Sequence, residues 1–123
     1  MNTAQTGSNK LDDLRAKVDQ FSADRDWGQF HTPKNLATAL SVEAAELLEH
    51  FQWQKGDEPF AELPEPKRVA IAHEVADVLV YLLRFCSVTG IDPIQAAEEK
   101  LALNAEKYPV DKVRGQSAKY TEY

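Results

Sequence analysis

The stretch VAIAHEVADVLVYLLRFCSV, residues 69–88, is apolar on almost every side of the helix that it predicts. Its only charged residues are Glu74, Asp77 and Arg84, apart from His73 when that ring is protonated. A helix that is apolar all round has to be buried on several sides, and one layer of neighbouring helices can hardly supply this. We therefore expect a helix over residues 66–89 that lies at an interface between subunits.

Two pairs of acidic residues lie inside apolar helical patterns. They are Glu43 with Glu46, and Glu74 with Asp77. The spacing of three positions places both carboxylates of a pair on one face of a helix. Burying unpaired carboxylates costs several kcal/mol, and no Lys or Arg in the two segments is spaced to neutralise all four acids. The sequence therefore predicts that these acids bind a divalent cation.

The ligand type narrows the choice of cation. Carboxylates without a nearby cysteine ligand suit a hard ion such as Mg²⁺, Mn²⁺ or Ca²⁺, and of these we expect Mg²⁺, with Mn²⁺ as a possible substitute. Mg²⁺ often shares its coordination with substrate phosphates, which points to phosphate chemistry. Two alternatives stay open: the acids could decorate a solvated helix face, or they could belong to a di-iron bundle. A di-iron site needs a Glu-x-x-His motif, and neither His50 nor His73 has an acid three residues before it.

Length and charge limit the functional classes. A chain of 123 residues forms one domain that would benefit from oligomerisation. The formal net charge of −6 argues against nucleic-acid binding through a basic surface. No uncharged run approaches the roughly 20 residues that a membrane span needs, and the polar start lacks the apolar region of a signal peptide. We expect a cytoplasmic protein without a membrane partner.

The helical patterns predict an all-α protein. Its expected four-helix core, three long helices plus an N-terminal helix, covers residues 9–24, 33–53, 66–89 and 93–109. We expect it to assemble into a homo-oligomeric helical bundle. Residues 1–8 are expected to form a disordered tail, 9–109 a single all-α domain, and 110–123 a C-terminal arm.

Two further segments carry candidate binding residues. Residues 26–35 form a loop that is dense in aromatic and polar side chains, and such loops commonly bind ligands. On the fourth helix, Lys100, Asn104, Lys107 and Tyr108 follow one side. Their ammonium and amide groups could hold phosphate oxygens, although a solvated face with an interfacial tyrosine has the same pattern.

These motifs resemble those of a known family, the MazG-like all-α nucleoside triphosphate pyrophosphohydrolases, and in particular its dCTP pyrophosphatase branch. The resemblance runs from about residue 11 to 122. It rests on the two acidic pairs and on four segments: Asp26-Trp27-x-Gln29-Phe30-His31-x-Pro33-x-Asn35-Leu36, Glu46-Leu47-x-x-x-Phe51-Gln52-Trp53, Asp77-Val78-Leu79-x-Tyr81-Leu82 and Lys119-Tyr120-Thr121-Glu122.

The resemblance implies a homo-oligomer, often a tetramer built as a dimer of dimers. It implies cleavage of a nucleoside triphosphate to a monophosphate and pyrophosphate, as housecleaning of the nucleotide pool. By this resemblance Mg²⁺ is held by Glu43, Glu46, Glu74 and Asp77. The substrate-binding residues that it implies are Trp27, Gly28, Gln29, Phe30, His31, Asn35, Trp53, Tyr81, Lys100, Asn104 and Tyr108. One position departs from the branch: Val18 stands where the first helix can lend a polar side chain to the pocket.

A mechanism is consistent with both lines of argument. Metal held by the acids would activate a water that attacks the α phosphorus, with Glu46 accepting its proton and Lys100 stabilising the departing pyrophosphate. The rings of Trp27, Phe30 and Trp53 offer faces on which a base can stack, although a tryptophan can equally serve core packing. The alternatives are a nonenzymatic nucleotide- or metal-binding helical oligomer, a metal-free interaction protein, and the same chemistry on dUTP or non-standard triphosphates.

Overall fold

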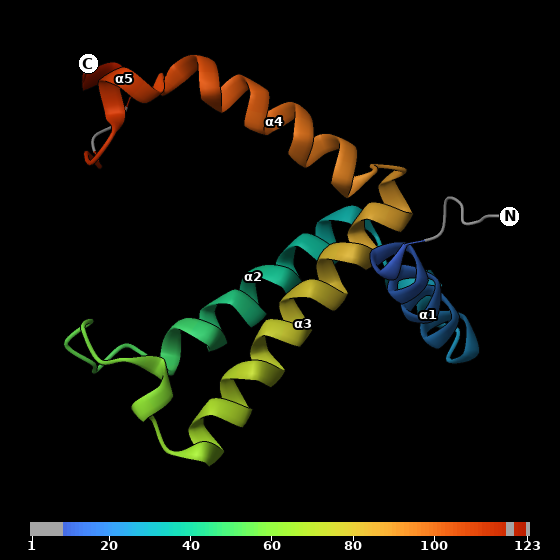
Figure 1. The fold of residues 1–123 in the computed structure, drawn as a ribbon. Coiled ribbons are helices and arrows are strands. Elements are labelled where there is room, and N and C mark those ends of the chain that lie inside the picture. Colours follow the sequence, from blue (N-terminus) through green and yellow to red (C-terminus); the bar gives the residue numbers. More distant parts are fainter. Residues whose placement is uncertain (1–8, 118–119, 123) are drawn as a thin grey trace, which may run out of the picture. The chain divides into compact units, whose positions relative to one another are not determined.

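The structure is a computed structural model that describes residues 9–117 and 120–122. Within these ranges it contains α-helices and short 3-10 turns and no strand, so the all-α prediction is confirmed. The α-helices are α1 (Lys10–Asp24), α2 (Pro33–Glu49), α3 (Glu65–Thr89), α4 (Pro93–Lys107) and α5 (Val110–Val113) (Figure 1). The chain forms two compact units, one ending at Gly90 and one beginning at Ile91, and each is described by itself.

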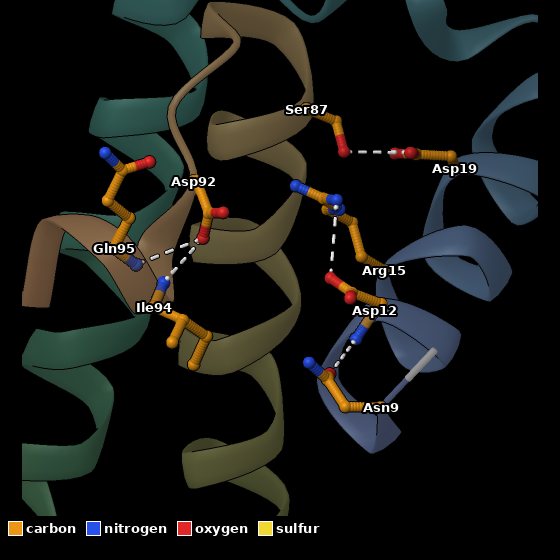
Figure 2. A network of polar contacts seen from close by, with 8 residues as sticks. All are labelled: Asn9, Asp12, Arg15, Asp19, Ser87, Asp92, Ile94 and Gln95. Atoms are coloured by element: carbon orange, nitrogen blue, oxygen red, sulfur yellow. Dashed lines mark hydrogen bonds and ion pairs between the residues drawn. The ribbon is translucent and has the colours of Figure 1, made fainter. Parts of the chain in front are cut away.

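Helix α1 begins where the sequence predicts. The side chain of Asn9 caps it by accepting a hydrogen bond from the backbone N–H of Asp12 at 2.8 Å, and Asp12 also pairs with Arg15 (Figure 2). Asp12 and Asp13 place negative charge in the first turn, where the helix dipole favours it. The helix buries Val18 and Ser22. Its inner face therefore includes a buried polar side chain, Ser22.

Helix α2 starts as predicted and ends earlier than predicted. Thr32 accepts a hydrogen bond from the backbone N–H of Asn35 at 3.2 Å, and Pro33 occupies the first turn, where its missing N–H costs nothing. The expected end at Trp53 is wrong, because the helix stops at Glu49. The backbone N–H of Phe51 bonds to the carbonyl of Leu48, three residues back, so the chain tightens into turns after the helix.

Helix α3 lies antiparallel beside α2 and forms most of the small core with it (Figure 1). It ends at Gly90, whose φ of 78° closes the helix with a hydrogen bond to the Cys86 carbonyl at 2.9 Å. The buried apolar residues of the described chain are Val18, Leu36, Ile71, Leu83 and Cys86. Several other apolar residues of α3 stay exposed in this single chain, including Val75 at 52% and Leu82 at 39%.

The second unit contains α4 and α5. Asp92 caps α4 by accepting hydrogen bonds from the backbone N–H groups of Ile94 and Gln95, at 3.0 and 3.2 Å (Figure 2). The helix ends at Lys107, two residues before the predicted end at Pro109. The predicted tail over residues 1–8 lies outside the described residues, as does Lys119 of the C-terminal motif. The expected domain of residues 9–109 and arm of 110–123 stay predictions.

Among the described helices, none is both long enough and apolar enough to cross a membrane.

Candidate active site

The two acidic pairs meet between α2 and α3. Glu43 and Glu46 come from α2, and Glu74 comes from the facing turns of α3. One carboxylate oxygen from each of these three residues lies within 4.8 Å of the other two, and all three side chains are half-buried. The carboxyl group of Asp77 lies next to that of Glu43. The fold therefore brings together all four acids that were predicted from the sequence.

The acids disturb one another because they are close together and partly removed from water. Burial, followed by the negative charge of Glu46 and the neighbouring carboxyl of Asp77, raises the pKa of Glu43 to about 7. Burial and then the Glu46 carboxyl raise the pKa of Glu74, while His50 opposes that shift. Glu43 and Glu74 therefore hold a proton more tightly than isolated carboxyl groups do.

One oxygen of this cluster has no hydrogen-bond partner. The Oε2 atom of Glu74 is buried and makes no hydrogen bond within the described part of the chain. An unsatisfied buried carboxylate oxygen is costly, and the donor set around it consists of oxygen atoms. Such a set fits a hard divalent cation such as Mg²⁺.

An open cavity of about 420 Å³ lies over part of the cluster and is lined by Glu46, Glu49, His50 and Glu74. Glu49 and His50 at the end of α2 were not predicted as site residues. Glu49 follows Glu46 at the same spacing of three positions that identified the acidic pairs, and this repeat is the signal that could have found it.

A second cavity, of about 430 Å³, lies between α1, the 3-10 turn of Trp27–Phe30 and α3. Four of the predicted site residues, Trp27, His31, Asp77 and Tyr81, line it together. The remaining lining residues are Lys17, Val18, Phe21, Ser22, Val80 and Arg84. Because Asp77 also belongs to the acidic cluster, this cavity adjoins the cluster.

Aromatic rings form one wall of this cavity. The rings of Phe21 and Trp27 meet edge to face, with centroids 5.7 Å apart, and the His31 ring lies 6.5 Å from that of Trp27. The guanidinium of Arg25 lies over the Phe21 ring, 3.5 Å from its centroid. Such a wall can hold a flat heterocycle by stacking and edge contacts.

Helix α1 contributes polar groups in spite of Val18. Val18 lines the cavity and is apolar, as the sequence indicated, but Lys17 and Ser22 of the same helix also line it. The signal that could have found Ser22 is its position four residues after Val18, which places both on one face of α1.

Some predicted loop residues support the turn and do not line the cavity. Gln29 donates hydrogen bonds to the carbonyl and the carboxylate of Asp26, at 3.0 and 3.1 Å, where Asp26 adopts a left-handed φ of 54°. Asn35 donates from its amide to the carbonyl of Phe30 at 3.0 Å. These bonds hold the turn that carries Trp27 and His31.

The other predicted residues lie apart from this cavity or in the second unit. The side chain of Phe30 is 59% exposed and that of Trp53 is 90% exposed, and neither lines the cavity. Gly28 adjoins Arg84: a Cβ at this position would lie 3.7 Å from the guanidinium Nη2. Lys100, Asn104 and Tyr108 belong to the unit that begins at Ile91.

A polar network that the sequence did not reveal connects Arg84 and His31, which line the cavity, to Asp19 and Ser87. Arg84 donates from Nε to His31 Nδ1 at 2.8 Å and from Nη1 to Asp19 Oδ1 at 2.9 Å. Ser87 of α3 donates to Asp19 Oδ2 of α1 at 2.8 Å, and Figure 2 shows this contact between the two helices. The signal for Arg84 was its position as the one arginine in the apolar stretch 69–88.

A profile of the MazG-like family matches residues 38–123, which include both acidic pairs. The chain belongs to the MazG-like family. It is 42% identical to dCTP pyrophosphatase 1 of Mus musculus and 41% identical to that of Homo sapiens, each over 113 residues and 91% of this chain. The chain spans 66% of the length of each of these relatives.

A solved structure extends this likeness to the MazG-like fold. The crystal structure of a pyrophosphatase from Archaeoglobus fulgidus superposes with a TM-score of 0.78 at 39% sequence identity. The similarity covers 87% of this chain and 99% of the archaeal chain. The family expected from the acidic pairs and the tryptophan-containing loop is therefore confirmed.

Proposed function

We propose that this MazG-like protein hydrolyses a deoxynucleoside triphosphate, dCTP or a modified dCTP, to the monophosphate and pyrophosphate with the help of Mg²⁺ or Mn²⁺. One observation carries the proposal: a cluster of carboxylates with an unsatisfied buried oxygen on Glu74 adjoins an aromatic cavity through Asp77. The likeness to dCTP pyrophosphatase 1 and to the archaeal pyrophosphatase supports the reaction and the choice of base.

The proposed metal ligands are Glu43, Glu46, Glu74 and Asp77. A cation held there supplies positive charge to phosphate oxygens and lowers the pKa of a bound water. Glu46 takes up the proton of the attacking water, which its place in both the cluster and the open cavity allows. The acids thus orient the nucleophile, while their negative charge is offset by the cation.

The proposed base site is the cavity between α1 and α3. Its volume of about 430 Å³ lies within the usual range for small-molecule sites. Trp27 and Tyr81 hold the base, and His31 meets its edge. Lys100, Asn104 and Tyr108 are proposed to contact the phosphates, with Lys100 stabilising the charge of the departing pyrophosphate.

The proposed assembly is a homotetramer, a dimer of dimers. The exposed apolar residues of α3 support it, because patches of this kind mark protein interfaces. Trp53, which is 90% exposed, is proposed to become buried in the same assembly. The proposed role is cytoplasmic housecleaning of the nucleotide pool.

The test is pyrophosphate release from a panel of ribo- and deoxynucleoside triphosphates, with Mg²⁺ and with EDTA. Wild type is compared with Glu46→Gln and Asp77→Asn, and Glu62→Gln, an exposed acid of the turn Phe60–Glu62, is the matched control. We expect metal-dependent release led by dCTP or a 5-substituted analogue, lost in both site variants and kept in the control. Orthophosphate as the product, or activity that survives both substitutions, would contradict the proposal.

A further inference from the structure

The contact between Arg84 and His31 fixes where the imidazole proton lies. A guanidinium carries only hydrogen-bond donors and stays protonated in proteins. Because Arg84 Nε approaches His31 Nδ1 at 2.8 Å, Nδ1 has to act as the acceptor. The neutral ring then carries its proton on Nε2, since one nitrogen of a neutral imidazole accepts and the other donates.

The guanidinium is itself held in place from the opposite side. Asp19 of α1 accepts from Arg84 Nη1 at 2.9 Å, and the second carboxylate oxygen of Asp19 accepts from Ser87 at 2.8 Å. The side chain of Arg84 is only 16% exposed, so its charge is partly shielded from water and paired with Asp19. The chain of contacts from Ser87 to His31 therefore leaves the guanidinium little freedom to turn away from the ring.

The environment also favours the neutral form of His31. Burial, followed by the positive charge of Arg84, lowers the pKa of His31. His31 lines the cavity next to Trp27, and no bond of its Nε2 to another described residue is found. The cavity is thus lined by a histidine whose ring proton lies on Nε2.

We propose that Arg84 is a positioning residue that fixes His31 as the Nε2–H tautomer, and that this N–H selects the substrate by donating to an acceptor atom on the edge of its base. The second half rests on the proposed function. In the cytosine ring the available acceptors are the carbonyl O2 and the unprotonated N3. A donor to N3 would discriminate against uracil, whose N3 carries a proton, whereas a donor to O2 would accept both bases.

The tautomer is tested without turnover, by the ¹⁵N chemical shifts of the His31 ring in the full chain, assigned from the signal lost in His31→Gln. We expect Nδ1 to resonate as an unprotonated nitrogen in the wild type. In Arg84→Met we expect both ring nitrogens to move toward exchange-averaged positions. Arg15→Met, which removes an arginine from the half-exposed pair with Asp12, is the control and should leave the ring unchanged. If Arg84→Met fails to fold, Asp19→Asn loosens the same guanidinium and is read in the same way.

Base recognition is tested by the binding of an α,β-imido triphosphate that cannot be cleaved between these phosphates. Three bases are compared: cytosine, 2-thiocytosine, whose sulfur is a poor acceptor, and 3-deazacytosine, which lacks the N3 acceptor. We expect one analogue to bind the wild type about three- to tenfold more weakly than the cytosine compound, the size of one neutral hydrogen bond. In Arg84→Met the ratio of the two dissociation constants should approach one. The cytosine compound itself should bind this variant about three- to tenfold more weakly than it binds the wild type.

The outcomes separate this inference from the proposed reaction. A protonated Nδ1 in the wild type, or a ring that does not respond to loss of Arg84, overturns the positioning role even if dCTP is cleaved. Equal binding of all three bases overturns the role of His31 in base selection. If pyrophosphate is not released but the ring and the analogues behave as expected, the reaction fails and the recognition stands.

Discussion

The acidic cluster joins α3 to α2, the Arg84 network joins α3 to α1, and the two handle charge in opposite ways. The cluster gathers carboxylates that repel one another and leaves an oxygen of Glu74 without a partner. In the network the positive charge of Arg84 is paired with Asp19 and bonded to His31. The first region is incomplete without a ligand, whereas the second is satisfied by the chain itself. Chemistry is therefore expected at the first region and selectivity at the second.

The largest expected effect comes from removing a ligand of the cluster. Mutating a residue just outside a metal's ligand shell typically lowers metal affinity or activity about 10–100-fold. Because Glu74 is itself a proposed ligand, Glu74→Gln should reduce metal-dependent pyrophosphate release by at least about 100-fold. Steady-state assays over a range of Mg²⁺ concentrations measure this loss. Full recovery at high Mg²⁺ would show that Glu74 only tunes affinity.

The next effect is stabilisation by a bound divalent cation. A ligand at 100 times its Kd adds about 2.7 kcal/mol, which for a domain of this size raises Tm by roughly 8–16 °C. Thermal unfolding with Mg²⁺, Mn²⁺ and EDTA measures the shift, and it should vanish in Glu74→Gln. An unchanged Tm at saturating metal would show that the acidic cluster does not depend on a cation for its stability.

A third effect is the pH dependence of the metal-free protein. The pKa of Glu43 is raised from 4.5 to about 7, so between these values the folded state binds more protons than the unfolded state. Stability should therefore fall as pH rises from about 4.5 through about 7. Chemical denaturation in EDTA across this range measures the slope, and Glu43→Gln should flatten it. A slope of the opposite sign would mean that the acids are stabilised by neighbours within the chain.

The smallest expected effect is on the satisfied region. Ser87→Ala removes one hydrogen bond to Asp19, whose side chain is 37% exposed, so it should cost only about 1 kcal/mol. Equilibrium urea denaturation measures this loss, and Mg²⁺ should stabilise the variant as much as the wild type. A changed response to Mg²⁺ would mean that the two regions are coupled.

The same two regions differ in how far the sequence could predict them. The acidic pairs were predictable because a spacing of three within an apolar helix is a local pattern, and burial of acids is chemically costly. The residues that contact Arg84 were not, because His31 and Asp19 lie 53 and 65 positions away along the chain. Such contacts depend on how α1 packs on α3, and helical periodicity does not encode that.

The starts of the helices could be predicted from the sequence better than the end of α2. The helix starts at Asn9, Thr32 and Asp92 were predictable, because a capping side chain lies within three residues of the backbone N–H from which it accepts a hydrogen bond. The end of α2 was placed at Trp53 because the apolar pattern continues past Glu49. That pattern persists through the turns that follow the helix, so periodicity overestimated its length.

Asp77 belongs both to the acidic cluster and to the lining of the cavity between α1 and α3. A substitution at Asp77 therefore alters the cavity and the acids at once. The α1 residues of the cavity do not belong to the acidic cluster; they include Lys17, Val18 and Ser22. Substitutions on α1 can therefore change the cavity without changing the acidic cluster of α2 and α3.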